Sequence, residues 1–195
     1  MTQDSAALEQ LRREIDRIDD QLHDLLMRRT GLVGQIAAAK PGGKVTIRPG
    51  REAQIIRRLV GRHQGPFPRL ALVRIWREIV GAMTGLQAPF PVAVHAAGRS
   101  TATIELARNH FGVVAPLRAF RSPGQVVRAV AEGQAAVGVI PLIPGTEAAD
   151  DAEPWWTNLT LESGDAPRVV ARLPFAPTAP VKGSAEPIQA LVIAC

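Results

Sequence analysis

The stretch LEQLRREIDRIDDQLHDLLMRRTGLVGQI, residues 8–36, decides the fold of the first part of this chain. Its apolar side chains recur at alternating spacings of three and four residues, the a/d stripe of a helix that packs lengthwise against a partner. With a cap at Asp4 or Ser5 and a stop at Pro-Gly-Gly, residues 41–43, the stripe predicts one helix of about 35 residues, roughly 50 Å long. The stripe consists of Leu8, Leu11, Ile15, Ile18, Leu22, Leu25, Leu32 and Ile36. A lone stripe of this length needs a partner, so we expect two such helices to pair across a homodimer.

Two shorter helices follow. Pro49 suits the first turn of a helix, and apolar residues at helical spacing continue to a stop near Gly65-Pro66. A third helix is predicted from Leu72 to Leu86. The apolar positions are Ile55, Ile56, Leu59 and Val60 in the second helix, and Leu72, Ile75, Trp76, Ile79, Val80, Met83 and Leu86 in the third. The first part of the chain is therefore predicted to be all-α, with three helices.

Composition changes near Ala-Pro-Phe-Pro, residues 88–91. Of the 23 Lys and Arg residues, 15 lie in residues 1–87 beside 9 acidic residues, a net charge of +6, while the remainder of the chain carries −1. Twelve of the 16 prolines lie after residue 87. Two compositions in one chain indicate two domains, 1–88 and 89–195. The overall charge of +5 belongs to the helical part and does not by itself indicate a nucleic-acid partner.

Several polar residues fall on the apolar faces of the predicted helices. Arg29 occupies an a position of the long stripe, and Lys40 follows eleven residues later, within about 20° around the helix axis. Arg12 lies beside the stripe. Glu52 and Gln87 point inward from the second and third helices because of their spacing to apolar residues.

The cations of this set outnumber the inward carboxylates. Glu52 and Asp19 are the obvious inward anions, and the cations to be neutralised are Arg12, Arg29, Lys40, Arg48 and Arg51. A buried cation without an anion is unfavourable, so a small anionic ligand is expected. Taken singly, each residue has an ordinary structural explanation, such as a register-setting Arg at an a position or a Lys at a helix end.

In order and spacing, these residues resemble the all-helical class of chorismate mutases. The segment Trp76-Arg77-Glu78-Ile79 resembles the third helix of mutases that are fused to prephenate dehydratase. The resemblance covers about residues 6–88. The pattern comprises Leu11-Arg12, Ile15, Ile18-Asp19, Leu22, Leu25-Leu26, Arg29, Lys40, Arg51-Glu52 and Gln87. It implies an intertwined helical homodimer that rearranges chorismate to prephenate in aromatic amino acid biosynthesis.

The resemblance implies a role for each polar residue. Chorismate is a dianion, and its intramolecular Claisen rearrangement needs no nucleophile, metal or cofactor. Arg29 and, from the other subunit, Arg12 would bind the carboxylates with their planar guanidinium groups. Lys40 and Gln87 would donate hydrogen bonds to the ether oxygen, and Glu52 would accept one from the ring hydroxyl.

Three further positions belong to the implied substrate-binding site. Arg51 would support the contact of Glu52 with the ring hydroxyl. Arg48 stands where relatives can carry an acidic residue, and Met83 stands where some carry Ser. Both departures concern substrate affinity rather than the type of reaction.

The second part of the chain alternates between strand and helix patterns, which predicts a small α/β domain with a mostly parallel sheet. Pro123 after Ser122 suits the first turn of a helix. The predicted strands are residues 91–95, 136–142, 168–173 and 190–193, and the predicted helices are residues 101–111 and 122–133.

This order resembles the catalytic domain of prephenate dehydratase. The likeness rests on Val92-Ala93-Val94, on Asn109-His110-Phe111-Gly112 and on residues 137–141, Val-Gly-Val-Ile-Pro. The family's active motifs are replaced by Gly98-Arg99-Ser100-Thr101, Ile143-Pro144-Gly145 and Ile188-Gln189-Ala190, and apolar residues cannot supply an acid catalyst. We therefore expect this half to be inactive as a dehydratase.

Other features narrow the possible functions. The longest apolar runs are too short to span a bilayer, and the first residues show no secretory signal, so a cytoplasmic protein without a membrane partner is expected. One cysteine and four unclustered histidines give no metal-ligating pattern. The alternatives to a chorismate mutase are an active bifunctional mutase/dehydratase, an isochorismate pyruvate lyase, and a non-enzymatic helical interaction or nucleic-acid module.

Overall fold

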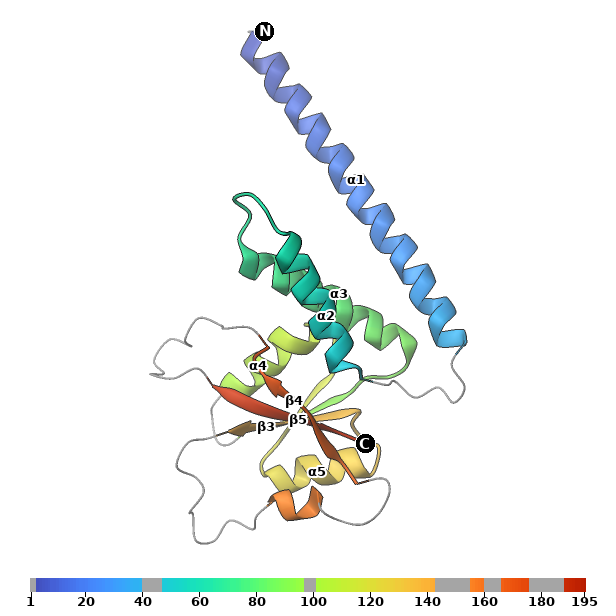
Figure 1. The fold of residues 1–195 in the computed structure, drawn as a ribbon, viewed down its shortest axis with the longest axis vertical. Helices are drawn as coiled ribbons and strands as arrows, with labels where there is room; N and C mark the ends of the chain where they lie inside the picture. Colours follow the sequence, from blue (N-terminus) through green and yellow to red (C-terminus); the bar gives the residue numbers. More distant parts are fainter. Residues whose placement is uncertain (1–2, 40–46, 97–100, 143–154, 160–165, 176–187) are drawn as a thin grey trace. The chain divides into compact units, whose positions relative to one another are not determined.

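The computed structural model describes residues 3–39, 47–96, 101–142, 155–159, 166–175 and 188–195 (Figure 1). The chain forms two compact units, Met1–Gly43 and Lys44–Cys195. The two units are therefore described separately. The predicted functional boundary between residues 88 and 89 lies inside the second unit and stays a prediction.

The first unit is the long helix α1 (Gln3–Ala38), as its heptad stripe predicts. The eight stripe residues are 48–64% exposed. Arg12 forms an ion pair with Glu9, and Arg17 forms one with Glu14, each three residues earlier in the helix. Such exposed pairs contribute little stability. An apolar stripe this exposed is typical of a helix that packs lengthwise against a partner.

The second unit begins with α2 (Pro49–Arg62) and α3 (Arg69–Gln87), which confirm the two shorter predicted helices. Pro49 stands in the first turn of α2, where its missing N–H leaves no intrahelical hydrogen bond unmade. The two helices pack together through apolar side chains. Ile56 and Leu59 of α2 and Leu72 and Trp76 of α3 border the same crevice.

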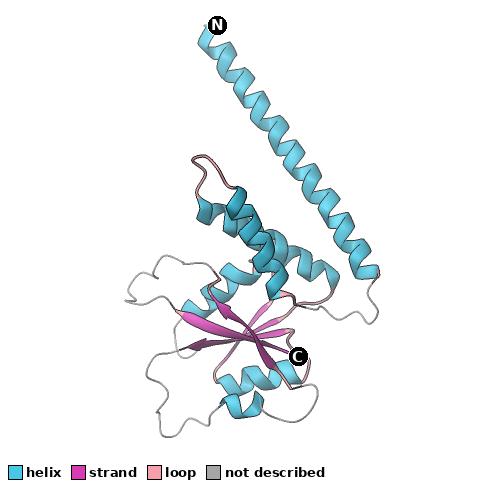
Figure 2. Cartoon of the chain, viewed as in Figure 1, coloured by secondary structure: helices cyan, strands magenta, loops and turns pink. Residues whose placement is uncertain are grey.

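The rest of the second unit contains a five-stranded sheet of order β2-β1-β3-β5-β4 (Figure 2). The strands are β1 (Val92–His95), β2 (Leu117–Phe120), β3 (Val137–Leu142), β4 (Arg168–Leu173) and β5 (Gln189–Ala194). β1 pairs in parallel with β2 and β3, whereas β5 pairs antiparallel with β3 and β4. The α/β class is confirmed, but the sheet is mixed, and the expected parallel arrangement holds only for its β2-β1-β3 half.

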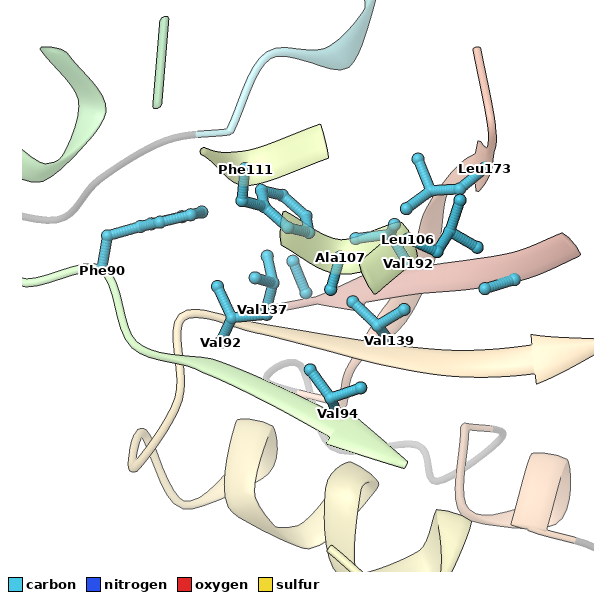
Figure 3. Packing of buried hydrophobic residues seen from close by; sticks show 12 residues of the cluster. Phe90, Val92, Val94, Leu106, Ala107, Phe111, Val137, Val139, Leu173 and Val192 are labelled. Carbon is cyan, nitrogen blue, oxygen red and sulfur yellow. The ribbon is translucent and has the colours of Figure 1, made fainter. Parts of the chain in front are cut away.

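Helices cover both faces of this sheet. Leu106, Ala107 and Phe111 of α4 (Ala102–Phe111) lie over Val92, Val94, Val137 and Val139, as Figure 3 shows. α5 (Pro123–Ala131) covers the opposite face together with the short 3-10 helix η2 (Trp155–Leu159). Full burial of one Val or Leu side chain contributes about 1.5–3 kcal/mol, so these two layers hold the unit together.

α3 also packs on α4 and so joins the helical part to the α/β part. A β-carbon on Gly81 of α3 would collide with the backbone oxygen of Phe111, so only glycine permits this close approach. Arg74 donates a hydrogen bond to Asn109 Oδ1 at 3.2 Å. None of the helices that the structure describes is long and apolar enough to cross a membrane.

Candidate functional site

Three of the predicted catalytic residues belong to the first unit. Arg12 is exposed, and its Nη1 atom lies 2.6 Å from Glu9 Oε1. Arg29 is partly buried, and its Nη1 atom is enclosed without a hydrogen-bond partner among the described residues. Lys40 lies outside the described residues.

Glu52 and Gln87, which belong to the second unit, border one small cavity of about 40 Å³. Val80, Thr84 and Gln87 line it from one face of α3 because they are spaced by four and three residues. The remaining lining residues are Ile47, Glu52, Gly81, Phe90, His110 and Phe111. The volume is enough for a water molecule or two and far below that of a pocket for a whole small-molecule ligand. The structure thus brings together two of the five predicted catalytic residues and lines their cavity with residues of the α/β part.

Glu52 forms a buried ion pair with Arg77 of α3. The Nη1 atom of Arg77 donates a hydrogen bond to Glu52 Oε2 at 2.8 Å, and the two side chains are 5% and 20% exposed. Burial raises the pKa of Glu52 above its usual value, and the charge of Arg77 opposes this shift only in part. Burial also lowers the pKa of Arg77, with Glu52 opposing that shift.

Arg77 has an aromatic neighbour from the far end of the chain. Its guanidinium carbon lies 4.7 Å from the ring centroid of Phe175, which follows β4. A cation over an aromatic face in a desolvated place is stabilised by about 2 kcal/mol. The Nη2 atom of Arg77 is buried without a hydrogen-bond partner among the described residues, so the ring face adds an interaction that Glu52 does not supply.

His110 of α4 completes this cluster. Its ring makes edge-to-face contacts with Phe111, 4.7 Å between centroids, and with Phe175, 4.8 Å between centroids. Burial, assisted by the positive charge of Arg77, lowers the pKa of His110 to about 3. The imidazole is therefore neutral at physiological pH and acts as an aromatic packing residue.

The other predicted site residues are close to the cavity or at the surface. The Nε2 atom of Gln87 donates to the backbone oxygen of Met83 at 3.3 Å, and Met83 is buried. Arg48 precedes the first turn of α2, where its backbone oxygen accepts from the N–H groups of Arg51 and Glu52. The side chains of Arg48 and Arg51 are exposed.

Arg77 was not predicted as a site residue, although it lies in the segment Trp76-Arg77-Glu78-Ile79 of the third helix. A local signal was present. Arg77 follows Val73 by four residues and precedes Val80 by three, which places a cation on the apolar face of α3. Phe175 gave no such signal, because its contact with Arg77 joins residues that are far apart in the chain.

The segments that replace the dehydratase motifs are described only in part. Residues 98–100 and 143–145 lie outside the described residues. Ile188 packs against the sheet core, and Gln189 begins β5, where its side chain accepts a hydrogen bond from Arg172. Within the described residues, no group of three His, Cys, Asp or Glu side chains is placed to hold a metal ion.

Comparison with known proteins adds independent information. The family model described as chorismate mutase type II matches residues 11–88. A bifunctional chorismate mutase/prephenate dehydratase of Pseudomonas aeruginosa is 30% identical over 166 residues, covering 82% of this chain and 43% of the relative. Proteins of the same description from Aquifex aeolicus and Neisseria gonorrhoeae are 33% identical over 140 residues and 30% identical over 136 residues, covering 69% and 70% of this chain.

These alignments are longer than the helical part, so the likeness extends into the α/β part. The chain spans only about two fifths of the length of these relatives: 43% of the Pseudomonas protein, 38% of the Aquifex protein and 37% of the Neisseria protein. No solved structure matches the chain significantly. Residues 11–88, which include most of the heptad helix, the two shorter helices, and Glu52 and Gln87 at one cavity, therefore match the chorismate mutase type II family.

Proposed function

We propose that this protein is a chorismate mutase that converts chorismate to prephenate. The observation that carries the proposal is the meeting of Glu52 and Gln87 at one cavity inside the segment that matches the mutase family. The substrate would be a small dicarboxylate, and no nucleic-acid or membrane partner is proposed.

The reaction breaks an ether C–O bond and forms a C–C bond within one molecule. No proton, electron or group is exchanged with the protein, so catalysis consists of holding the reactive conformer and stabilising the charge that develops on the ether oxygen. The Gln87 amide would donate to that oxygen together with the Lys40 ammonium group. Arg12 and Arg29 would bind the two carboxylates.

Glu52 would act as a hydrogen-bond acceptor for the ring hydroxyl of the substrate. This role needs the carboxylate form, and burial alone would favour the protonated form. Arg77 opposes protonation from 2.8 Å away. Because Oε2 accepts from Arg77, Oε1 is the atom proposed to receive the substrate hydroxyl.

The proposed enzyme is a homodimer in which Arg12 acts across the interface. The stripe on α1 is about half exposed along its whole length, which is unfavourable for an isolated helix in water. A second copy of the same stripe is its natural partner, since an a/d pattern is self-complementary about a two-fold axis. Arg48, Arg51 and Met83 would border the substrate in this dimer.

The α/β part is proposed to be inactive as a prephenate dehydratase, because the motif positions hold residues that cannot supply acid catalysis. Relatives of this chain are bifunctional enzymes, so an active dehydratase is the alternative that the comparisons favour. A cytoplasmic location is proposed as for a biosynthetic enzyme.

One assay separates these possibilities. Purified protein is incubated in separate reactions with chorismate and with isochorismate, and both the loss of substrate and the products formed are measured over time. Prephenate alone supports the proposal, phenylpyruvate would indicate a bifunctional enzyme, and release of pyruvate from isochorismate would indicate a lyase. The variant Lys40→Ala should lower kcat by at least about 100-fold, the loss typical of removing a donor to developing charge. Arg57→Ala, at an exposed position on α2, is the control and should leave kcat unchanged.

A further inference from the structure

We propose that Arg77 and Phe175 are positioning residues for Glu52, so that the α/β part contributes to the mutase site through Phe175. This inference rests on the proposed function of Glu52 as the acceptor for the substrate hydroxyl. It assigns a role in the mutase reaction to the α/β part, which is proposed to be inactive as a prephenate dehydratase.

The first step is the fixing of Glu52 by Arg77. The two residues come from different helices, α2 and α3, and meet through a single hydrogen bond of 2.8 Å. Both side chains are largely buried. A buried carboxylate that lost this partner would either take up a proton or turn toward water, and both changes would remove the acceptor.

The second step is the fixing of Arg77 by Phe175. A long Arg side chain has several rotamers, and one hydrogen bond restrains it incompletely. The Phe175 ring supplies the second restraint, because its centroid lies 4.7 Å from the guanidinium carbon, which sits over the ring. Phe175 also packs against the cluster between α4 and the sheet, so its position is set by the α/β core.

The third step is the support of Phe175 by His110. The rings of His110 and Phe175 pack edge to face, and His110 lies at the cavity that Glu52 and Gln87 border. A protonated imidazole here would face Arg77 with like charge, and burial keeps it neutral. A continuous series of contacts therefore runs from Glu52 through Arg77 and Phe175 to His110.

The geometry gives this series a consequence for rate. Orientation of an acceptor matters strongly for a reaction that depends on positioning, and a displacement of about 1 Å can lower the rate by about 100-fold. Arg77 from α3 is in direct contact with Glu52, and His110 from α4 borders the same cavity. On its own helix, Arg48 and Arg51 are near in sequence but exposed.

The experiment compares Phe175→Leu, Arg77→Met and Arg77→Lys with wild type by measuring kcat and KM for chorismate across pH. Phe175→Leu and Arg77→Met should lower kcat by at least about 10-fold. Loss of the Arg77 charge should also move the acid limb of the pH profile to higher pH, because Glu52 is then protonated more easily. Arg77→Lys should restore the wild-type limb in part. The control is Phe67→Leu, the same change at a half-exposed ring in the loop between α2 and α3, which should leave both quantities unchanged.

A double-variant comparison distinguishes positioning from general loss of structure. If Arg77 acts through Glu52, then Arg77→Met should lower kcat less than about two-fold further in a protein that already carries Glu52→Gln. Each variant is assayed well below its own unfolding midpoint. If Arg77→Met does not fold, Phe175→Leu tests the same series of contacts.

The two proposals fail in different ways. A wild-type chain without mutase activity would contradict the proposed function. The positioning role would be overturned by a different result, in which the wild type is active and Glu52→Gln is inactive, but Phe175→Leu and Arg77→Met keep the wild-type kcat and acid limb. In that case the proposed function would still hold.

Discussion

Glu78 on α3 accepts a hydrogen bond at 3.0 Å from the backbone N–H of Val113, which lies 35 residues later, just beyond α4. The same carboxylate lies next to Gly112, whose φ of 88° is in the left-handed region that favours glycine. Together with the close approach of Gly81 to Phe111, this contact ties the last helix of the mutase-like segment to the α/β part. The second unit is therefore expected to unfold as one body.

The close approach of α3 and α4 predicts a sharp difference between two glycines of one helix. Gly81→Ala should destabilise the protein by about 1–3 kcal/mol, because the new methyl group meets the backbone of Phe111. A β-carbon on Gly85 would meet no atom within 4 Å. Gly85→Ala should therefore stabilise the protein by about 0.5–1 kcal/mol, because alanine has the higher helix propensity. Urea unfolding at equilibrium measures both. Equal effects of the two changes would contradict the packing described for α3.

The half-buried His110 predicts a pH dependence of stability. Its pKa is lowered from the ordinary value of 6.5 to about 3 in the folded protein, so below pH 6.5 the unfolded chain binds a proton that the folded chain does not. The free energy of unfolding should therefore fall as pH decreases from about 6.5 toward 3, with a contribution of at most about 1.4 kcal/mol per pH unit.

His110→Phe should remove that contribution while keeping ring contacts with Phe111 and Phe175. The measurement is the difference in unfolding free energy between variant and wild type at several pH values. His23→Phe, at an exposed position on α1, serves as the matched control. A difference between His110→Phe and wild type that stays constant with pH would show that His110 does not titrate as described.

The proposed dimer predicts complementation between two inactive variants. If Arg12 acts in the partner's site and Lys40 acts in its own, each of Arg12→Ala and Lys40→Ala should be inactive alone. A mixed dimer of the two holds one intact site, so unfolding and refolding an equimolar mixture should restore about a quarter of wild-type activity. Sedimentation measures the oligomeric state in parallel. A mixture that stays inactive although mixed dimers form would place both residues in one subunit's site.

Local patterns in the sequence predicted most of the helices and strands, since heptad spacing, Pro49 and short apolar runs each act over a few residues. The strand β2 was not predicted, because Leu117–Phe120 is four residues long, lies at the sheet edge and has two exposed residues in its middle. The direction of β5, which runs antiparallel to its neighbours β3 and β4, was not predicted either. Strand direction depends on how the chain returns to the sheet, and strand composition does not encode it.

In the candidate site too, residues were predictable from local spacing, whereas contacts between distant parts of the chain were not. Glu52 and Gln87 were predicted from helical spacing, and the structure brings both to one cavity. Arg77 was detectable as a cation on an apolar face, but its partners were not, because Glu52 and Phe175 reach it from two other elements. The assignment of Arg12, Arg29, Lys40, Arg48, Arg51 and Met83 to the site stays a prediction.

Gln87 predicts how the activity depends on pH. An amide donates a hydrogen bond at every pH, so the wild-type rate should not fall toward neutral pH on account of this residue. Gln87→Glu replaces the donor by a carboxyl group that donates only when protonated and repels the developing negative charge when ionised. The variant should therefore be slower than wild type by at least about 100-fold at neutral pH and recover as pH decreases, because protonation restores the donor. Gln87→Leu, which donates at no pH, should be slow throughout. The ratio of kcat for Gln87→Glu and Gln87→Leu, followed from pH 8 to pH 5, isolates the donated hydrogen bond from other titrations, and a ratio that does not change with pH would exclude Gln87 as the donor to the ether oxygen.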